Sequence, residues 1–372
     1  MRSNTDQYLD LFLNDTPMMD VRAPVEFDQG AFPHTQNIPL LDDEQRAIIG
    51  KQYKDAGQDE AIELGLKLAT PDIREQRLAD WKAFVDKNPK GYLYCFRGGL
   101  RSRTTQAWLK EQGVEYPLIV GGYKAMRRFL IEQLALSVQQ IPFVILSGLT
   151  GSGKTRVLQK TPWHIDLEGL ANHRGSAFGR DVDDFQPTPI NFENALSIAA
   201  LKYRHQHPQA GVLLEDEGKL IGRLLLPQAM HQKMIHSPRI FLERSTAERV
   251  DIIRQDYIAS SWPQYQQRYG DQAEDKFTEF VLDNLARIRK RLGGERYQAI
   301  QRSFAAALQH LFASGDSYGF DEGIQSLLLD YYDPMYQYQL EKKPVEIVFR
   351  GTEDEILQWA GQHLQNWHAA QD

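Results

Sequence analysis

The fold of the second half of this chain follows from one stretch of sequence, Phe143-Val-Ile-Leu-Ser-Gly-Leu-Thr-Gly-Ser-Gly-Lys-Thr155. Its first four residues are all apolar, which is typical of a parallel strand that is buried on both faces in the centre of a sheet. Glycines and small polar residues follow the strand and predict a turn that leads into a helix. A strand, a glycine-rich turn and a helix in this order indicate an α/β domain with a parallel sheet.

The turn after this strand has the spacing G-x-x-x-x-G-K-[ST], which is that of a phosphate-binding loop. In such a loop, backbone N–H groups surround a diphosphate, the lysine neutralises its outer oxygens, and the final hydroxyl can bind Mg²⁺. Any diphosphate ester fits this geometry, and ATP is the default ligand. The residues that we predict to bind phosphate are Gly148, Gly151, Ser152, Gly153, Lys154 and Thr155, and magnesium would bind through Thr155.

Acidic residues end a second apolar run, Val212-Leu-Leu-Glu-Asp-Glu217. Carboxylates at the end of a strand beside a phosphate loop can hold magnesium through water. We predict this supporting role for Glu215 and Asp216. The alternative is a solvated strand end that binds no ligand.

A polar segment, Asp166-Leu-Glu-Gly-Leu-Ala-Asn-His-Arg-Gly-Ser176, follows another short apolar run. Polar residues are too dense in it for a buried element, so we predict a loop that contacts a ligand. His173 and Arg174 are the candidates for contact with phosphate or with a nucleic-acid backbone. The alternative is a surface loop without a ligand.

Apolar runs and helical periodicity alternate on both sides of residue 140 and predict two α/β domains. The first domain, residues 1–140, is expected to contain strands at 18–21, 92–95 and 118–120 and helices at 71–88 and 102–112, the latter capped by Ser102. The second domain, residues 141–372, is expected to contain strands at 143–146, 164–167, 212–215, 240–243 and 345–349. Two long helices within 273–312, separated at Gly293-Gly294, form its helical C-terminal part.

The overall composition excludes several classes of protein. The chain has 372 residues and one cysteine, so it can form neither an intramolecular disulfide nor a multi-thiolate zinc site. Its 43 Lys and Arg residues face 50 Asp and Glu residues, and this acidic balance argues against a surface that is basic throughout for binding nucleic acid. The N-terminal segment lacks a basic start and a long apolar stretch, so we expect a cytoplasmic protein with no membrane partner.

A local basic patch is compatible with this net charge. Five cations lie close together near the end of the first long helix: Arg287, Arg289, Lys290, Arg291 and Arg296. Cations suit the C-terminal end of a helix dipole, and binding of an RNA backbone is the competing explanation.

The single cysteine, Cys95, ends a predicted strand and begins the loop Cys95-Phe-Arg-Gly-Gly-Leu-Arg-Ser-Arg103. Nearby cations and the N–H groups at the start of a helix both favour the reactive thiolate. Gly98 and Gly99 allow positive φ, so the loop can curl into a cradle for an anion. A buried structural thiol beside solvated arginines is the alternative. The catalytic candidates are Cys95, Arg97 and Arg101.

The first 140 residues resemble a rhodanese domain, which implies transfer of a sulfur group. The segments that carry the resemblance are Asp20-Val-Arg22, Glu26-Phe-Asp-Gln-Gly30, Asn37-Ile-Pro39 and Cys95, which lies where rhodaneses carry their persulfide-forming cysteine. Arg101 lies six positions after Cys95, one more than in common rhodaneses. This longer loop is shared with rhodanese-like protein phosphatases and could admit a larger chalcogen or a phosphorylated donor.

A rhodanese-like domain followed by a phosphate-loop domain closely resembles the tRNA 2-selenouridine synthase family, over nearly the whole chain. The resemblance implies replacement of sulfur by selenium in 2-thiouridine at the wobble position of tRNA. It implies S-geranylation from geranyl diphosphate and then selenation from selenophosphate, with Cys95 carrying selenium as an S-selanyl group. We expect Arg97 and Arg101 to bind the phosphate of the selenium donor. Both donors are substrates, no tightly bound organic cofactor is expected, and the oligomeric state is left open.

Two other functions are compatible with the same motifs. One is an ATP-dependent kinase or nucleotide switch that carries a rhodanese domain as a sulfur carrier. The other is an RNA-binding or thiol-sensing module in which Cys95 only responds to oxidation.

Overall fold

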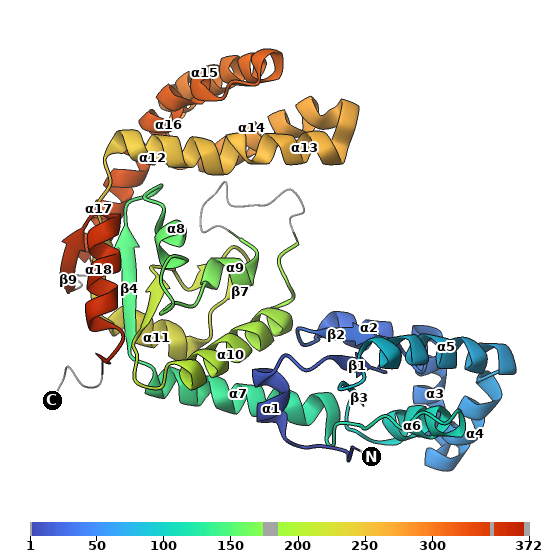
Figure 1. The fold of residues 1–372 in the computed structure, drawn as a ribbon. Helices are drawn as coiled ribbons and strands as arrows, with labels where there is room; N and C mark the ends of the chain where they lie inside the picture. The colour runs from blue at the N-terminus through green and yellow to red at the C-terminus, as the bar shows by residue number, and fades with distance from the viewer. Residues whose placement is uncertain (1, 174–184, 343–345, 368–372) are drawn as a thin grey trace. The chain divides into compact units, whose positions relative to one another are not determined.

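The computed structural model describes residues 2–173, 185–342 and 346–367 (Figure 1). The chain forms two compact units. The N-terminal unit contains Met1–Ser137 and also Thr188–His205, and the C-terminal unit contains Val138–Pro187 and Gln206–Asp372. A helix that follows the phosphate loop in sequence therefore packs with the N-terminal unit.

The sheet of the N-terminal unit has three parallel strands in the order β2-β1-β3. Every residue of the central strand β1 is buried. The expected strand at 118–120 is wrong: Leu118 and Ile119 form only isolated bridges. Gly121 and Gly122 follow with positive φ and turn the chain into a helix before a ladder can form. The strands are β1 (Met18–Asp20), β2 (Thr35–Asn37) and β3 (Tyr92–Tyr94).

Of the two helices predicted in this unit, α5 has a side-chain cap at its N-terminus and α6 lacks the predicted one. Thr70 caps α5 by accepting a hydrogen bond from the N–H of Ile73, as Thr-Pro sequences favour. Helix α6 begins earlier than expected, after Gly99 with φ −96°, so Ser102 does not cap it but is buried in its first turn. The helices are α1 (Tyr8–Leu13), α2 (Pro24–Gln29), α3 (Asp43–Ala56), α4 (Gln58–Leu68), α5 (Pro71–Lys87), α6 (Leu100–Glu111), α7 (Gly122–Gln140) and α10 (Pro189–Gln206).

The main sheet of the C-terminal unit has four parallel strands in the order β5-β4-β8-β9. All six residues of β4 are buried, which confirms the expected central strand. The carboxyl ends of neighbouring parallel strands meet at one edge, where α/β proteins bind ligands. The strands are β4 (Phe143–Gly148), β5 (Val212–Glu215), β8 (Arg239–Leu242) and β9 (Ile347–Gly351), with a small antiparallel pair of β6 (Leu220–Ile221) and β7 (Leu224–Leu225).

The expected strand at 164–167 is wrong. His164 makes an isolated bridge to Leu213, and helix α9 (Leu167–Ala171) begins directly afterwards. The reason is a helix cap, because the carboxylate of Asp166 accepts a hydrogen bond of 2.7 Å from the N–H of Gly169.

Helices cover the main sheet and build the C-terminal part of this unit (Figure 1). The two long helices predicted within 273–312 are confirmed, and Gly293, with φ 88°, separates them. No helix among the described residues combines the length and the apolar character needed to cross a membrane. The remaining elements are α8 (Lys154–Leu158), α11 (Gln228–His236), α12 (Thr246–Ile253), the π-helix η1 (Arg254–Ala259), α13 (Ser261–Tyr269), the 3₁₀ helix η2 (Gly270–Gln272), α14 (Ala273–Leu292), α15 (Gly294–Ser314), the 3₁₀ helix η3 (Tyr318–Phe320), α16 (Asp321–Leu327), the π-helix η4 (Leu328–Tyr332), α17 (Asp333–Lys342) and α18 (Glu353–His363).

Candidate functional site

The phosphate loop links β4 to α8, and two of its glycines adopt a conformation that side chains avoid. Gly151 and Gly153 have φ of 79° and 77°. A Cβ atom on Gly151 would lie 2.6 Å from Cδ1 of Ile253, and one on Gly153 would lie 3.2 Å from Cδ1 of Ile252. Glycine is needed at these positions because the loop packs closely against the end of α12.

Two arginines hold the backbone of the phosphate loop. Nε of Arg249 donates to the carbonyl oxygen of Thr150 at 2.9 Å, and its terminal nitrogens bind both carboxylate oxygens of Asp333 at 2.6 and 2.9 Å. Nε of Arg244 donates to the carbonyl oxygen of Ser152 at 2.9 Å. Because the loop carbonyls are bound by these side chains, the shape of the loop is organised by the protein itself.

Lys154 and Thr155 begin α8, where the phosphate motif requires them. Within the described part of the chain, Nζ of Lys154 donates to the carbonyl oxygen of Gly148 at 3.3 Å and forms no ion pair. The hydroxyl of Thr155 donates to Oε2 of Glu168 at 3.2 Å. The ammonium group of Lys154 is therefore available for an anion in the loop.

Three carboxylates from two segments meet beside Thr155. Glu168 lies in α9, Glu215 ends β5 and Glu217 follows it, and each offers an oxygen within 4.8 Å of the others. Glu215 is 1% exposed, and neither of its carboxylate oxygens has a hydrogen-bond partner among the described residues. A set of oxygen ligands of this kind suits a hard divalent cation such as Mg²⁺.

Burial and mutual repulsion disfavour the charged forms of these carboxylates. Burial, together with the charge of Glu168, raises the pKa of Glu215 to about 8. Burial and the charges of Glu168 and Glu215 raise the pKa of Glu217 well above its ordinary value. A cation bound between the three groups would relieve this repulsion.

The other predicted residues of this unit do not join the carboxylate group. Asp216 accepts a hydrogen bond of 2.8 Å from Oγ of Ser147 and pairs with Arg239 at 3.3 Å. His173 lies two residues after the end of α9 and packs against Gly222. A Cβ atom on Gly222 would lie 2.7 Å from Cδ2 of the His173 ring. Arg174 lies outside the described residues.

A cavity of about 830 Å³ connects the phosphate loop and the three carboxylates with an apolar wall. Both π-helical segments of the described chain contribute to this wall, η1 through Tyr257 and η4 through Tyr332. Such segments are frequent at functional sites. The cavity therefore brings apolar side chains close to the phosphate loop, although polar residues such as His231, Arg239 and Asp256 line it as well. Its apolar lining includes Ile252, Ile253, Tyr257, Ile288, Tyr332 and Met335.

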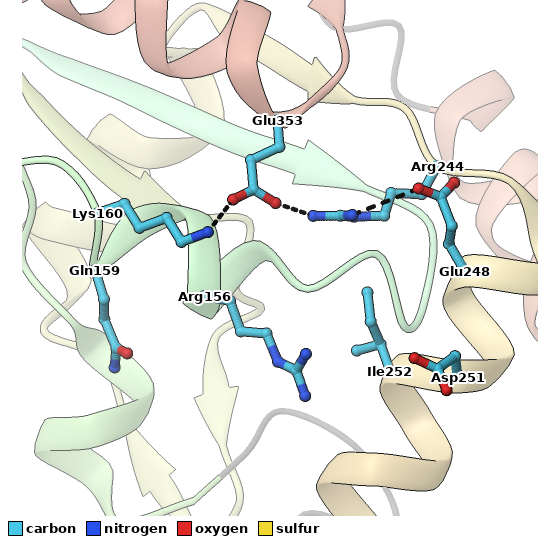
Figure 2. Close-up of a pocket in the computed structure, with 8 residues that line it drawn as sticks. All are labelled: Arg156, Gln159, Lys160, Arg244, Glu248, Asp251, Ile252 and Glu353. Atoms are coloured by element: carbon cyan, nitrogen blue, oxygen red, sulfur yellow. Dashed lines mark hydrogen bonds and ion pairs between the residues drawn. The ribbon is translucent and has the colours of Figure 1, made fainter.

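A second cavity, of about 520 Å³, is lined by cations that already have acidic partners (Figure 2). Lys160 and Arg244 both donate to the carboxylate of Glu353. Arg156 pairs with Asp256. Because the positive charges are neutralised locally, this cavity is a poor site for an additional anion.

In the N-terminal unit, Cys95 directly follows β3 and is 3% exposed. The carbonyl oxygens of Cys95 and Phe96 accept hydrogen bonds, both 2.9 Å long, from the N–H groups of Tyr123 and Lys124 in the first turn of α7. Gly98 has φ 62°, and a Cβ atom there would lie 2.8 Å from a backbone nitrogen of the turn before α7. The start of the loop is thus packed tightly and requires this glycine.

Arg101 lies in the first turn of α6 and forms a two-pronged ion pair with Glu26 of α2. Burial lowers the pKa of Arg101, but the bonds to Glu26 and the charge of nearby Cys95 outweigh it, so that the pKa is raised. Burial alone would raise the pKa of Glu26. The hydrogen bonds and charges of Arg101 and other donors outweigh this effect, so the pKa of Glu26 is lowered overall. Arg97 is exposed, with its guanidinium 5.9 Å from the centre of the Phe96 ring. Arg101 therefore lies near the thiol with a carboxylate partner of its own.

Three acidic residues of these sites were not among the predicted site residues: Glu26, Glu168 and Glu217. The alternation of side chains along an extended segment places residues 215 and 217 on one side and 216 on the other, so a signal for Glu217 was present. Glu168 and Glu26 are brought in by helices, and their distances to Thr155 and Arg101 depend on tertiary packing.

Comparisons with known proteins agree with these motifs. The family model described as the tRNA 2-selenouridine synthase AAA domain matches residues 141–367. Proteins named tRNA 2-selenouridine synthase from Marinobacter nauticus, Alcanivorax borkumensis and Hahella chejuensis are 52%, 48% and 48% identical to this chain. The similarity covers 96%, 96% and 94% of this chain and 98%, 98% and 92% of the relatives. The chain therefore belongs to the tRNA 2-selenouridine synthase family.

Proposed function

We propose that this chain is a tRNA-modifying transferase that replaces sulfur by selenium in 2-thiouridine at the wobble position. Its similarity to tRNA 2-selenouridine synthases over nearly their full length supports this activity. We place the reaction in the cytoplasm and assign one chemical step to each unit. The C-terminal unit would activate the sulfur by geranylation, and the N-terminal unit, which we interpret as rhodanese-like, would deliver selenium.

The observation that carries the first assignment is the cavity of the C-terminal unit, which joins a phosphate loop to an apolar wall. The ribose and base of a nucleotide would seek hydrogen-bond partners beyond the phosphates. The apolar chain of geranyl diphosphate would instead bury its surface against side chains such as Ile252, Ile288 and Met335. The cavity thus offers apolar surface for the chain of geranyl diphosphate beside the phosphate loop, while its polar lining residues, such as His231 and Arg239, keep a nucleotide as the competing ligand.

In this step the sulfur of 2-thiouridine attacks C1 of the geranyl group. The new carbon–sulfur bond forms as the carbon–oxygen bond to diphosphate breaks, the uridine loses its N3 proton, and diphosphate leaves with the electron pair. Lys154 and the loop N–H groups would stabilise the developing charge of the leaving group. Glu168, Glu215, Glu217 and Thr155 have the oxygen ligands to hold Mg²⁺ there, and the ion would supply further charge neutralisation.

Alkylation makes the sulfur a better leaving group, so that selenium can replace it at C2 while the geranyl thiol departs. In our proposal Cys95 starts as a mixed disulfide with an external thiol. The selenide-level selenium of selenophosphate displaces that thiol from the Cys95 sulfur, and hydrolysis of the Se–P bond releases phosphate and leaves an S-selanyl group. Selenophosphate would be bound through the exposed Arg97 and through Arg101, which would share its guanidinium between the donor and Glu26. The S-selanyl selenium would attack C2 and expel the geranyl thiol. Because the chain has no second cysteine, the external thiol would then cleave the remaining S–Se bond, which releases 2-selenouridine and restores the mixed disulfide of Cys95.

Mass spectrometry of tRNA that contains 2-thiouridine tests this function. Geranyl diphosphate alone should give the S-geranyl product, and both donors together should give 2-selenouridine. Lys154→Ala should slow geranylation by about 10²–10³-fold, the usual effect of removing one group that stabilises the transition-state charge. Lys160→Ala, which removes a lysine of the second cavity, serves as the matched control.

Two results would contradict the proposal. Nucleotide hydrolysis that depends on Lys154, with tRNA of unchanged mass, would support the kinase or switch. Unchanged tRNA without any nucleotide turnover would support the RNA-binding or thiol-sensing module.

A further inference from the structure

The junction of α14 and α15 carries a group of exposed cations that the function described so far does not use. We name it the α14–α15 basic patch. None of its members forms an ion pair with a carboxylate of the described chain, although Arg289 stacks on Tyr297 at 5.2 Å. The patch consists of Arg287, Arg289, Lys290, Arg291 and Arg296, all of them exposed.

The helix dipole explains only part of this patch. Lys290 and Arg291 lie in the last turn of α14, where cations are favoured. Arg296, however, lies in the first turn of α15, where the positive end of the dipole disfavours a cation. The second cavity offers a contrast, since Lys160 and Arg244 pair with Glu353 there (Figure 2) and Arg156 pairs with Asp256. Unmatched cations on a chain with a net charge of −7 call for an external anion.

The patch borders the cavity that contains the phosphate loop. Arg291 lines this cavity together with Lys154. Arg287, Lys290 and Arg291 are three and four positions apart, so they share one face of α14. Nη1 of Arg296 lies 3.5 Å from the carbonyl oxygen of Asp330 in η4, next to cavity-lining tyrosines. An anion on this patch would therefore lie at the margin of the cavity.

We infer that the α14–α15 basic patch binds the phosphate backbone of the tRNA and positions the wobble uridine at the cavity. The inference rests on the proposed function for the identity of the RNA. Arginine and lysine contacts to phosphates fix the register of a nucleic acid and provide affinity without reading its sequence. A local patch is required because the acidic balance of the whole chain repels RNA elsewhere.

The test measures binding of full-length protein to tRNA containing 2-thiouridine by fluorescence anisotropy, over a range of KCl concentrations. The variant combines Arg287→Gln, Lys290→Gln and Arg296→Gln, which leaves the cavity-lining Arg291 in place. Its Kd should rise at least about tenfold at 0.1 M salt, and the slope of log Kd against log salt should fall by about 2, since each lost phosphate contact removes roughly 0.7–0.9. Arg302→Gln, an exposed arginine of α15 outside the patch, should leave both quantities unchanged.

Charge-conserving variants and single variants separate the effect of lost charge from an effect of misfolding. Arg287→Lys combined with Arg296→Lys should retain the salt slope, because the slope depends on the number of phosphates that the cations neutralise. The thermal unfolding midpoint checks that the triple variant is folded, and the three single variants, each with a smaller loss, replace it if it is not. An unchanged Kd and slope in a folded variant would overturn the inference. So would displacement of tRNA by polyglutamate at equal charge concentration, which would indicate docking of an acidic protein segment.

The binding assay separates this inference from the proposed function. If wild-type protein binds tRNA through the patch but does not modify it, the patch stands and the proposed function fails. If wild-type protein modifies tRNA and the triple variant has a normal KM for it, the patch is wrong and the function stands.

Discussion

The Cys95 loop and the phosphate loop have a similar backbone arrangement but differ in how their charged side chains are paired. Each follows a parallel strand, contains a glycine with positive φ and leads into a helix. In the first loop, Arg101 is already paired with Glu26. In the second, Lys154 forms no ion pair in the described chain, and three carboxylates face one another beside Thr155.

This difference indicates what each loop needs. In the Cys95 loop the charge of Arg101 is neutralised by Glu26, so an anionic donor must share Arg101 with Glu26 or rely on the exposed Arg97. The phosphate loop is incomplete by itself, because it offers an unpaired cation for an anion and an acidic cluster for a cation. Under the proposed function, the two loops of similar shape would bind different partners, a single small anion and a metal-bound diphosphate.

The largest expected effect concerns the first loop. Cys95→Ser should reduce selenation by roughly 10³-fold or more, the scale seen when a covalent nucleophile is removed, while S-geranylation continues. Product masses from reactions with one donor and with both donors measure the two steps separately. Cys95→Ser protein that still makes 2-selenouridine at the wild-type rate would rule out the selenium-carrying role.

The next effect concerns the carboxylates of the second loop. The pKa of Glu215 is about 8 in the folded protein and 4.5 in the unfolded chain. Between these pH values the folded protein keeps the Glu215 proton, whereas the unfolded chain has released it. Stability without metal should therefore fall as pH rises from about 4.5 to about 8, by a few kcal/mol at roughly 1.4 kcal/mol for each pKa unit. Glu217 acts in the same direction.

Thermal unfolding at several pH values, with and without Mg²⁺, measures this dependence. Glu215→Gln should reduce the loss of stability with rising pH, and Mg²⁺ should reverse that loss in the wild-type protein. Glu322→Gln, an exposed control on α16, should leave the pH dependence unchanged. If the stability of the wild-type protein changed neither with pH nor with Mg²⁺, the three carboxylates would not bind the ion.

The smallest effect concerns the ion pair of the first loop. A double-mutant cycle of Glu26→Gln and Arg101→Gln, followed by urea unfolding, should give a coupling of about 1–3 kcal/mol, typical of hydrogen bonds between charged groups. Since Arg101 lowers the pKa of Glu26, this coupling should be present above pH 4.5 and disappear as the pH falls below it. Arg46→Gln, which removes a more distant cation at 3.6 Å, is the control. Strictly additive effects would mean that Glu26 does not hold Arg101.

Some strands and helices were predictable from local sequence patterns, and others were not. The strand 143–146 was predictable because a continuous apolar run needs burial on both faces, whatever surrounds it. The long helices were predictable because Gly293 ends one of them locally. The strand expected at 164–167 failed because the Asp166 side chain caps a helix, and Ser102 failed as a cap because α6 already begins after Gly99.

By itself the sequence determined the parallel sheet around β4, the phosphate loop and the cysteine loop, because each depends on residues adjacent in the chain. Only the tertiary structure decided that Glu26 neutralises Arg101, that Glu168 joins Glu215 and Glu217, and that an apolar wall faces the phosphate loop. These features join residues from separate elements. The physical reason is that ion pairing, carboxylate repulsion and apolar burial depend on distances in space, which packing sets and local sequence patterns do not contain.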